Sequence, residues 1–151
     1  MCIGMYAGVR CALFSILEGS KNMPIDYEWD KKNSLIRTRL WGEVTDEDIN
    51  AHTLKLFRDT RLTPPLLEII DTHDVDKLNI TSQSLKNIAD GARVNLEKFA
   101  GHRTAIVAAT DVIFGMARMY EILSDVAGSP VKIAAFRNIE DAIAWLNHNK
   151  K

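Results

Sequence analysis

The sequence predicts one α/β domain over residues 23–151, with a mixed, mostly parallel five-stranded sheet, an antiparallel N-terminal hairpin and four helices. Three observations predict this class. Segments with strand periodicity alternate with segments of helical periodicity, in the order β-β-α-β-α-β-α-β-α. Capping or turn residues separate the segments. The chain of 151 residues, 46% of them hydrophobic, is also long enough to bury one continuous core.

The first two strands are predicted at residues 25–30 and 34–41, where apolar and polar side chains alternate. The polar turn between them contains Asn33, a residue that tolerates the left-handed conformation of tight turns. We expect Gly42 to end the hairpin. One face of the second strand carries Ile36, Thr38 and Leu40.

The first helix is expected to run from a cap at Thr45, followed by an acidic first turn, to about Arg58. The apolar run at residues 66–70 then predicts a strand covered on both faces, and residues 72–79 predict a polar loop. A second helix begins at Thr81 or Ser82 and continues to about residue 99. The remaining strands and helices are predicted at residues 104–109, 111–127, 131–136 and 138–146. Helix crossovers between the later strands place helices on both faces of the sheet.

The helix at residues 111–127 is apolar over more of its circumference than one sheet face requires. This excess marks a candidate ligand or partner surface. Its residues are Met116, Met119, Tyr120, Ile122 and Leu123.

Two polar clusters are candidate sites. Asp71, His73 and Asp74 follow a buried strand, where open parallel sheets bind ligands, and they are suited to hold a metal or act as a general base. A solvated turn is the alternative. Thr81, Ser82 and Ser84 are candidate phosphoacceptors at a helix N-terminus, with plain capping as the alternative. The scattered histidines are interpreted as ordinary surface or core residues: His52, His102 and His148.

Several common catalytic and cofactor-binding motifs are absent from the sequence, among them phosphate-binding glycine loops, a nucleophile elbow and the zinc-protease helix motif. We therefore expect a protein that is not an enzyme, with no catalytic residue, cofactor or metal. The net charge of −1 argues against binding nucleic acid through a basic surface. Only two cysteines occur, so a disulfide framework is not expected and a reducing, cytoplasmic location is the simplest interpretation.

Residues 1–22 are interpreted as an N-terminal extension, upstream of a natural start at Met23. A targeting or membrane-touching segment and a packed helix are the alternatives. The apolar run at residues 11–17 is shorter than the ~20 residues that a membrane span needs, so no integral span is expected.

The chain resembles the SpoIIAA-like, or STAS/SEC14-like, family, which is widespread in bacteria. The resemblance covers about residues 25–146. It rests on Gly42-x-Val44-Thr45, a strand ending in Asp71, Arg103-Thr104-Ala105-Ile106-Val107, Gly115-Met116-Ala117-Arg118 and Phe136-Arg137-x-x-Glu140-Asp141-Ala142-x-x-Trp145-Leu146.

This resemblance implies two modes of action. STAS proteins work through protein contacts switched by phosphorylation of a serine in an Asp-Ser-Ser-Gly motif. Residues 80–83 keep hydroxyls at that place but lack the aspartate and the glycine. The SEC14 half of the name implies an apolar ligand.

The leading hypothesis is a non-enzymatic regulatory or binding module that contacts another protein or a second copy. A carrier of a lipid or other small apolar ligand is the first alternative. A metal-dependent enzyme using the Asp71, His73 and Asp74 cluster is the second.

Overall fold

The computed structural model describes residues 23–148; the predicted N-terminal extension and both cysteines lie outside the described residues. The elements, in order, are β1 (Ile25–Asp30), β2 (Leu35–Thr45), α2 (Asp46–Arg58), β3 (Leu67–Asn79), α3 (Ser82–Val94), α4 (Leu96–Phe99), β4 (Arg103–Val107), α5 (Asp111–Val126), β5 (Lys132–Phe136) and α6 (Ile139–His148). The predicted fold class and element order are confirmed, with the short helix α4 as an addition.

The five strands form one sheet in the order β1-β2-β3-β4-β5. β1 pairs antiparallel with β2, as the hairpin prediction requires, and every other neighbouring pair is parallel. β3 is the central strand, so side chains in its middle lie far from either sheet edge. In the register of β3 with β4, Glu68 stands opposite Thr104.

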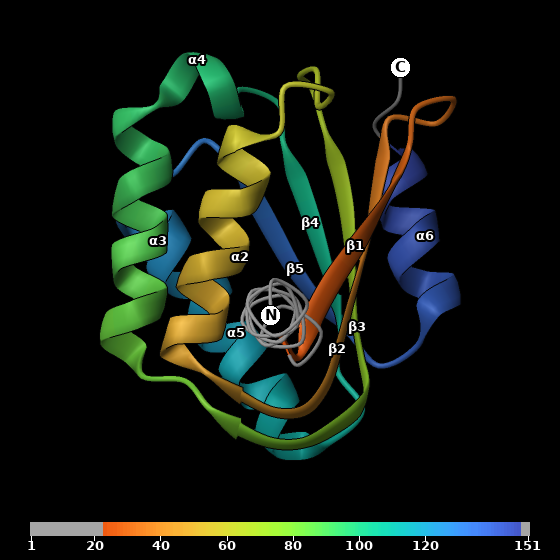
Figure 1. Ribbon diagram of the computed structural model, residues 1–151, viewed down its shortest axis with the longest axis vertical. Helices are drawn as coiled ribbons and strands as arrows, with labels where there is room; N and C mark the ends of the chain where they lie inside the picture. The colour runs from red at the N-terminus through yellow and green to blue at the C-terminus, as the bar shows by residue number, and fades with distance from the viewer. Residues whose placement is uncertain (1–22, 149–151) are drawn as a thin grey trace, which may run out of the picture.

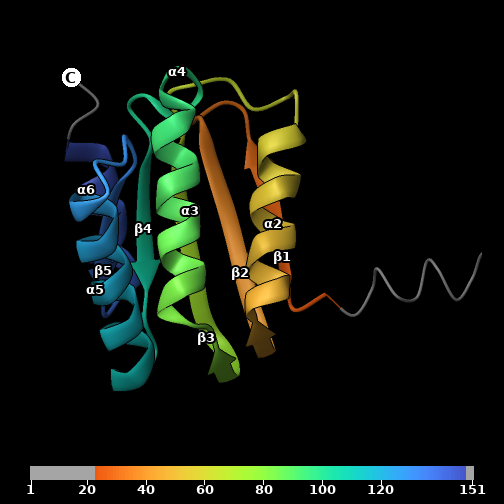
Figure 2. The same cartoon turned by 90° about the vertical axis from the view of Figure 1, so that its left-hand side faces the viewer.

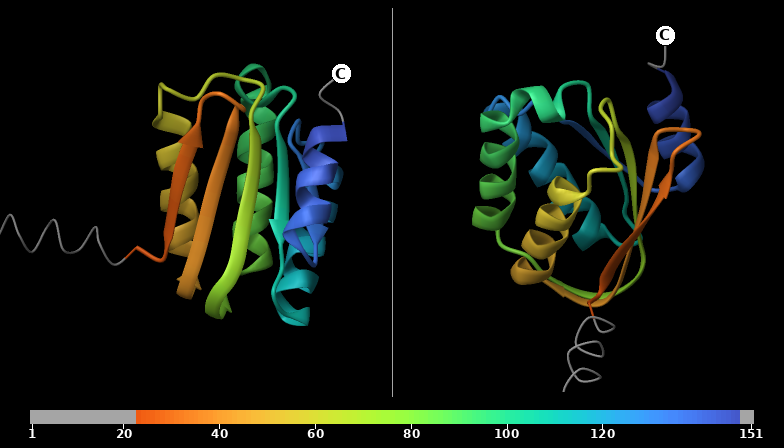
Figure 3. Two further views of the ribbon diagram at one scale, coloured as in Figure 1. Left: turned by 90° about the vertical axis from the view of Figure 1, so that its right-hand side faces the viewer. Right: turned by 45° about the horizontal axis from the view of Figure 1, so that its top comes forward.

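Helices cover both faces of the sheet, as Figure 1 shows edge-on. α2, α3 and α5 lie on one face and α6 lies on the other, where it packs across β3, β4 and β5 (Figure 3). Because side chains alternate along a strand, the strands beneath α6 contribute residues to the cores on both faces. The core beneath α6 contains Ile69, Ala105, Val107, Ala142 and Leu146.

α3 is the helix that stands off the sheet. It makes its main contacts with α5 and α2 rather than with the strands, and Figure 2 shows it in front of the sheet between those two helices. Small buried residues, Ala89 and Ala92, lie on its inner side. A helix held away from the strands by its neighbours, with few long side chains beneath it, leaves interior space on this face.

β2 and β3 are both longer than predicted. The antiparallel pairing with β1 ends at Leu40, just before Gly42, but Gly42 does not end the strand: with φ of 63° it lies within β2, next to a shift in the register with β3. A glycine tolerates this backbone conformation without steric cost, so the strand bends there and continues. β2 therefore runs to Thr45, and β3 pairs with it as far as Asn79.

The predicted loop at residues 72–79 is consequently wrong, because these residues form the second half of β3. The extended pairing has an apolar reason. Val75 and Leu78 pack against Val44 in a small core cluster. Burying these apolar side chains offsets the conformational entropy that this otherwise polar segment loses when it is ordered. Because residues 72–79 are mostly polar, the sequence pattern does not predict that they pair with β2.

Two local predictions also need correction. Ser34, with φ of 51°, takes the left-handed position of the hairpin turn, while the Asn33 side-chain amide donates to Asp30 at 2.7 Å. The helix expected to reach residue 99 breaks at Asn95, whose side chain donates to the Gly91 carbonyl at 2.8 Å. A separate turn of helix, α4, follows.

Within residues 23–148, no helix combines the length and apolar character needed to cross a membrane.

Candidate functional site

A cavity of about 570 Å³ lies between the sheet and the helices α2, α3 and α5. Most of its wall is apolar and comes from elements far apart in the sequence, including Ile36 of β2, Leu56 of α2, Leu85 of α3 and Ile106 of β4. Small-molecule sites typically measure about 300–1,000 Å³ and are lined in this way, with few polar groups. We therefore take this cavity as the candidate site.

Glu68 is the charged group in the interior of the cavity wall. The other charged residue of the lining, Lys98, is exposed and donates a hydrogen bond to the Phe57 carbonyl. Glu68 interrupts the apolar strand β3, and side-chain alternation points it into the cavity while Ile69 faces α6. Its Oε1 accepts a hydrogen bond of 2.6 Å from the Thr38 hydroxyl, and its Oε2 accepts one of 3.3 Å from Thr104. The side chain is only 14% exposed. Hydroxyls on the two flanking strands thus hold the carboxylate in place.

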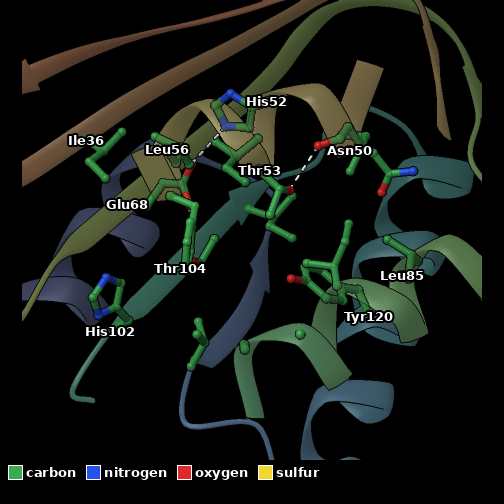
Figure 4. A pocket seen from close by; sticks show the side chains of 18 of the residues that line it. Ile36, Asn50, His52, Thr53, Leu56, Glu68, Leu85, His102, Thr104 and Tyr120 are labelled. Carbon is green, nitrogen blue, oxygen red and sulfur yellow. Dashed lines mark hydrogen bonds and ion pairs between the residues drawn. The ribbon is translucent and has the colours of Figure 1, made fainter. Parts of the chain in front are cut away.

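His52 of α2 lies above this carboxylate (Figure 4). Its Nε2 is 3.6 Å from Glu68 Oε1, and its side chain is 8% exposed. The ring meets Tyr27 of β1 edge-on, at 5.7 Å between centroids. Among residues 23–148, Nε2 has no partner at hydrogen-bonding distance. A buried polar atom without a hydrogen bond is costly, which makes it a candidate ligand contact.

The surroundings of Glu68 favour its charged form. Burial by itself raises the pKa of this carboxyl, but the proximity of His52 and the hydroxyls of Thr38 and Thr104 outweigh burial. The pKa of Glu68 therefore lies below its usual value. The cavity contains an ionised acceptor at neutral pH.

Two further polar groups contribute to the same cavity. The hydroxyl of Tyr120 points toward the side of the cavity on which Glu68 and Thr104 lie (Figure 4). Burial, aided by the charge of Glu68, raises its pKa, so the phenol is neutral and able to donate. Burial lowers the pKa of His102, whose Nδ1 has no hydrogen-bond partner within the described part of the chain. The site thus combines an apolar wall with the Glu68 carboxylate, the Tyr120 hydroxyl and the imidazole rings of His52 and His102.

The structure divides the predicted surface of α5. Met116 and Tyr120 line the cavity, whereas Ile122 is 56% exposed on the outer side of the helix. Met119 and Leu123 are partly buried. The apolar side chains of α5 therefore fall into two groups, one that lines the cavity and one that is exposed on the surface of the domain.

Asp71, His73 and Asp74 do not line the cavity. They lie in β3, where His73 Nδ1 is 2.6 Å from Asp71 Oδ1 and Arg39 Nε donates to Asp74 at 3.0 Å. These exposed side chains are thus paired with one another and with β2. No group of three or more metal-ligating side chains is present in residues 23–148.

The candidate phosphoacceptors differ in accessibility. Thr81 caps α3, as predicted: its hydroxyl accepts from the Ser84 amide at 3.2 Å and donates to Asp46 at 2.7 Å. A phosphate on Thr81 would therefore meet a carboxylate. Ser84 is buried and Ser82 is exposed. Of the three hydroxyls, that of Ser82 is both exposed and uninvolved in capping.

Sequence reasoning missed the polar core of the site. Glu68 lies within the run that predicts an apolar strand, and the sequence predicts ordinary surface or core histidines at His52 and His102. The available signal was the charge in the middle of Leu66-Leu67-Glu68-Ile69-Ile70, since ionisable residues are rarely buried without partners. The histidines carried no comparable signal, because only the fold brings α2 and the start of β4 to one cavity.

The five-stranded mixed sheet, its antiparallel first pair and the helices on both faces define a SpoIIAA-like fold, which confirms the predicted resemblance. A similar crystal structure is that of an uncharacterized protein of the DUF3478 family with a SpoIIAA-like fold, from Shewanella loihica PV-4. The TM-score is 0.50 at 20% identity, and the match covers 81% of this chain and 91% of that one. Such identity establishes the fold alone. Neither a protein-family model nor a curated protein matches the chain.

Proposed function

We propose that this protein is a non-enzymatic binding module that takes up a small, largely apolar molecule between the sheet and α3. The observation that carries the proposal is the cavity of about 570 Å³ with the mostly buried, ionised Glu68 in its wall. Burying a carboxylate costs free energy that an apolar residue of similar size would not, so a functional use accounts for its presence. α3 is suited to act as the cover, since it contacts its neighbouring helices more than the strands.

Filling the cavity should abolish ligand binding. In the Ala92→Phe variant, a ring enters the cavity from α3, where Ala92 forms part of the wall. We expect 1-octanol to raise the Tm of the unmodified protein and leave that of the variant unchanged. Binding at 100 times Kd stabilises a protein by about 2.7 kcal/mol, which differential scanning fluorimetry detects readily.

Ala144→Phe is the matched control, because Ala144 is exposed on α6, across the sheet from the cavity. It should keep the full response to 1-octanol. Native mass spectrometry of freshly purified protein provides a second measurement. An unmodified protein that neither retains a ligand nor responds to 1-octanol would refute the proposal.

A second candidate function, contact with a second copy of the chain, is favoured by the outer side of α5. Apolar or small residues recur there at intervals of three and four, and we call this set the α5 stripe: Val112, Gly115, Met119, Ile122 and Val126. Val126 is 81% exposed and Ile122 is 56% exposed. This spacing is the one by which two helices pack along a seam.

The charges beside the α5 stripe suit an antiparallel pairing. Arg118 and Asp125 flank it on one side, seven residues apart and with opposite signs. Within its own helix, Arg118 also pairs with Glu121 at 2.6 Å. In an antiparallel pair related by a two-fold axis, the same flank of each helix faces the other. Arg118 of one copy then lies near Asp125 of the second copy, and the pair occurs twice. A second copy is thus complementary both in apolar character and in charge.

Light scattering after size-exclusion chromatography tests this pairing. We expect a dimer, with Ile122→Asp giving a monomer and Leu96→Asp, at an exposed apolar residue of α4, leaving the dimer intact. Arg118→Asp should weaken the dimer at least about tenfold, and adding Asp125→Arg should restore it. A monomer at every concentration, or a dimer indifferent to these changes, would refute the pairing.

A further inference from the structure

We infer that the polar end of the bound molecule is a hydrogen-bond donor, an alcohol or an amine, that binds Glu68, and that the cavity discriminates against carboxylates. This inference rests on the proposed function of ligand binding and specifies its substrate class. It follows from the hydrogen-bonding capacity of two groups of the cavity, the Glu68 carboxylate and the Tyr120 hydroxyl.

Glu68 has acceptor capacity to spare. An ionised carboxylate offers about four lone-pair directions. Thr38 and Thr104 donate to it, while His52 Nε2, at 3.6 Å, lies beyond hydrogen-bonding distance. Since the Glu68 side chain lines the cavity and retains some exposure, the remaining capacity is directed at a bound molecule. Only a donor satisfies it.

The opposite side of the cavity adds a complementary group. The Tyr120 hydroxyl lines the cavity and points toward the side of Glu68 and Thr104 (Figure 4). A neutral phenol donates a hydrogen bond as well as accepting one. An alcohol placed between the two groups donates to Glu68 and accepts from Tyr120. An ammonium group at the same place donates to Glu68 and is also attracted by the negative charge of the carboxylate.

A carboxylate has the opposite fit. Its two oxygens only accept when ionised, so it offers no proton to Glu68. It also brings a second negative charge close to Glu68 in a partly enclosed, largely apolar space, where like charges are less screened than in water. One of the two carboxyl groups must then take up a proton for both to remain. A free fatty acid is therefore a poor occupant, although its chain suits the wall.

Isothermal titration calorimetry at pH 7 with 1-octanol, octylamine and octanoate compares three head groups on one chain. We expect the alcohol or the amine to bind at least about tenfold more tightly than octanoate. If 1-octanol binds most tightly, the hydrogen bond to Glu68 dominates recognition. If octylamine binds most tightly, the charge of Glu68 dominates it. Octanoate binding as tightly as both other probes would overturn the inference.

Glu68→Gln keeps the shape of the side chain and removes its charge. We expect it to reduce the discrimination against octanoate at least about tenfold and to weaken octylamine binding, with folding checked by circular dichroism. Tyr120→Phe is a milder change. It should weaken the binding of 1-octanol several-fold and leave the binding of octylamine unaffected. Unchanged selectivity in both folded variants would contradict the inference. Binding of all three probes without selectivity refutes this inference alone, whereas no binding of any probe refutes the proposed function as well.

Discussion

Replacing His52 by leucine is expected to lower the free energy of unfolding by about 3 kcal/mol at neutral pH. The substitution leaves Glu68 ionised and 14% exposed, with only two threonine hydroxyls to offset the loss of hydration. Urea unfolding followed by circular dichroism measures the change. The effect is large because the carboxylate of Glu68 loses its neighbouring imidazole. Loss of packing contributes little, because leucine nearly retains the volume of the histidine side chain.

The double variant His52→Leu/Glu68→Leu separates this explanation from a packing defect. Removing both members of a buried pair costs less than the sum of the single changes, because no uncompensated charge remains. We expect the double variant to be more stable than His52→Leu alone. Additive losses within about 0.5 kcal/mol would show that the two side chains do not interact.

The same pair predicts a dependence on pH. The pKa of Glu68 is lower in the folded protein than its usual value of 4.5, so the folded state binds a proton less readily than the unfolded chain. The stabilisation is complete above that usual value and is lost as the pH falls through the lower, folded pKa. The stability of Glu68→Leu should therefore decline less than that of the unmodified protein over this acidic range.

Shortening Leu146 to alanine is expected to destabilise the protein by about 3 kcal/mol. Leu146 is buried against Ile69, Ala105 and Val107, in the core between α6 and the sheet. Among the described helices, α6 alone packs on this face, so no neighbouring helix can move in to fill the void. Chemical denaturation gives the magnitude, and the midpoint should shift without a change in the slope.

Ile143→Ala is the matched control within the same helix. Ile143 is partly exposed, so less apolar surface returns to water and little cavity forms. We expect a loss of less than about 1 kcal/mol. Equal losses at the two positions would mean that α6 is not anchored by its inner side, contrary to the contacts observed.

The two faces of the sheet have different roles. The face beneath α6 is closely packed, with Ala105, Val107 and Ala142 fully or almost fully buried. The face beneath α2, α3 and α5 retains the cavity. β3 contributes to both, because Ile69 enters the packed core while Glu68 enters the cavity. Stability changes at Leu146 and binding changes at Glu68 therefore probe separate parts of one strand.

Local patterns were sufficient to predict the type and order of the elements. Capping at Thr45 and Thr81 depends on residues within one turn of the helix, and the structure contains both caps. The alternation of Ile36, Thr38 and Leu40 likewise predicted one buried face of β2, and all three are buried. Such signals depend on neighbouring residues, which any single sequence reveals.

The extents of the central strands and the composition of the site were decided by tertiary structure. β3 continues through a polar segment because β2 lies beside it and Val44 covers Val75 and Leu78, a pairing between residues about thirty apart. Likewise, Glu68, His52 and Tyr120 line one cavity only because α2 and α5 lie on the same face of the sheet. Local periodicity predicts the type and order of the strands and helices, but it does not predict the second half of β3. The cavity and its polar groups depended on the folded arrangement, since those contacts join residues that are distant in the chain.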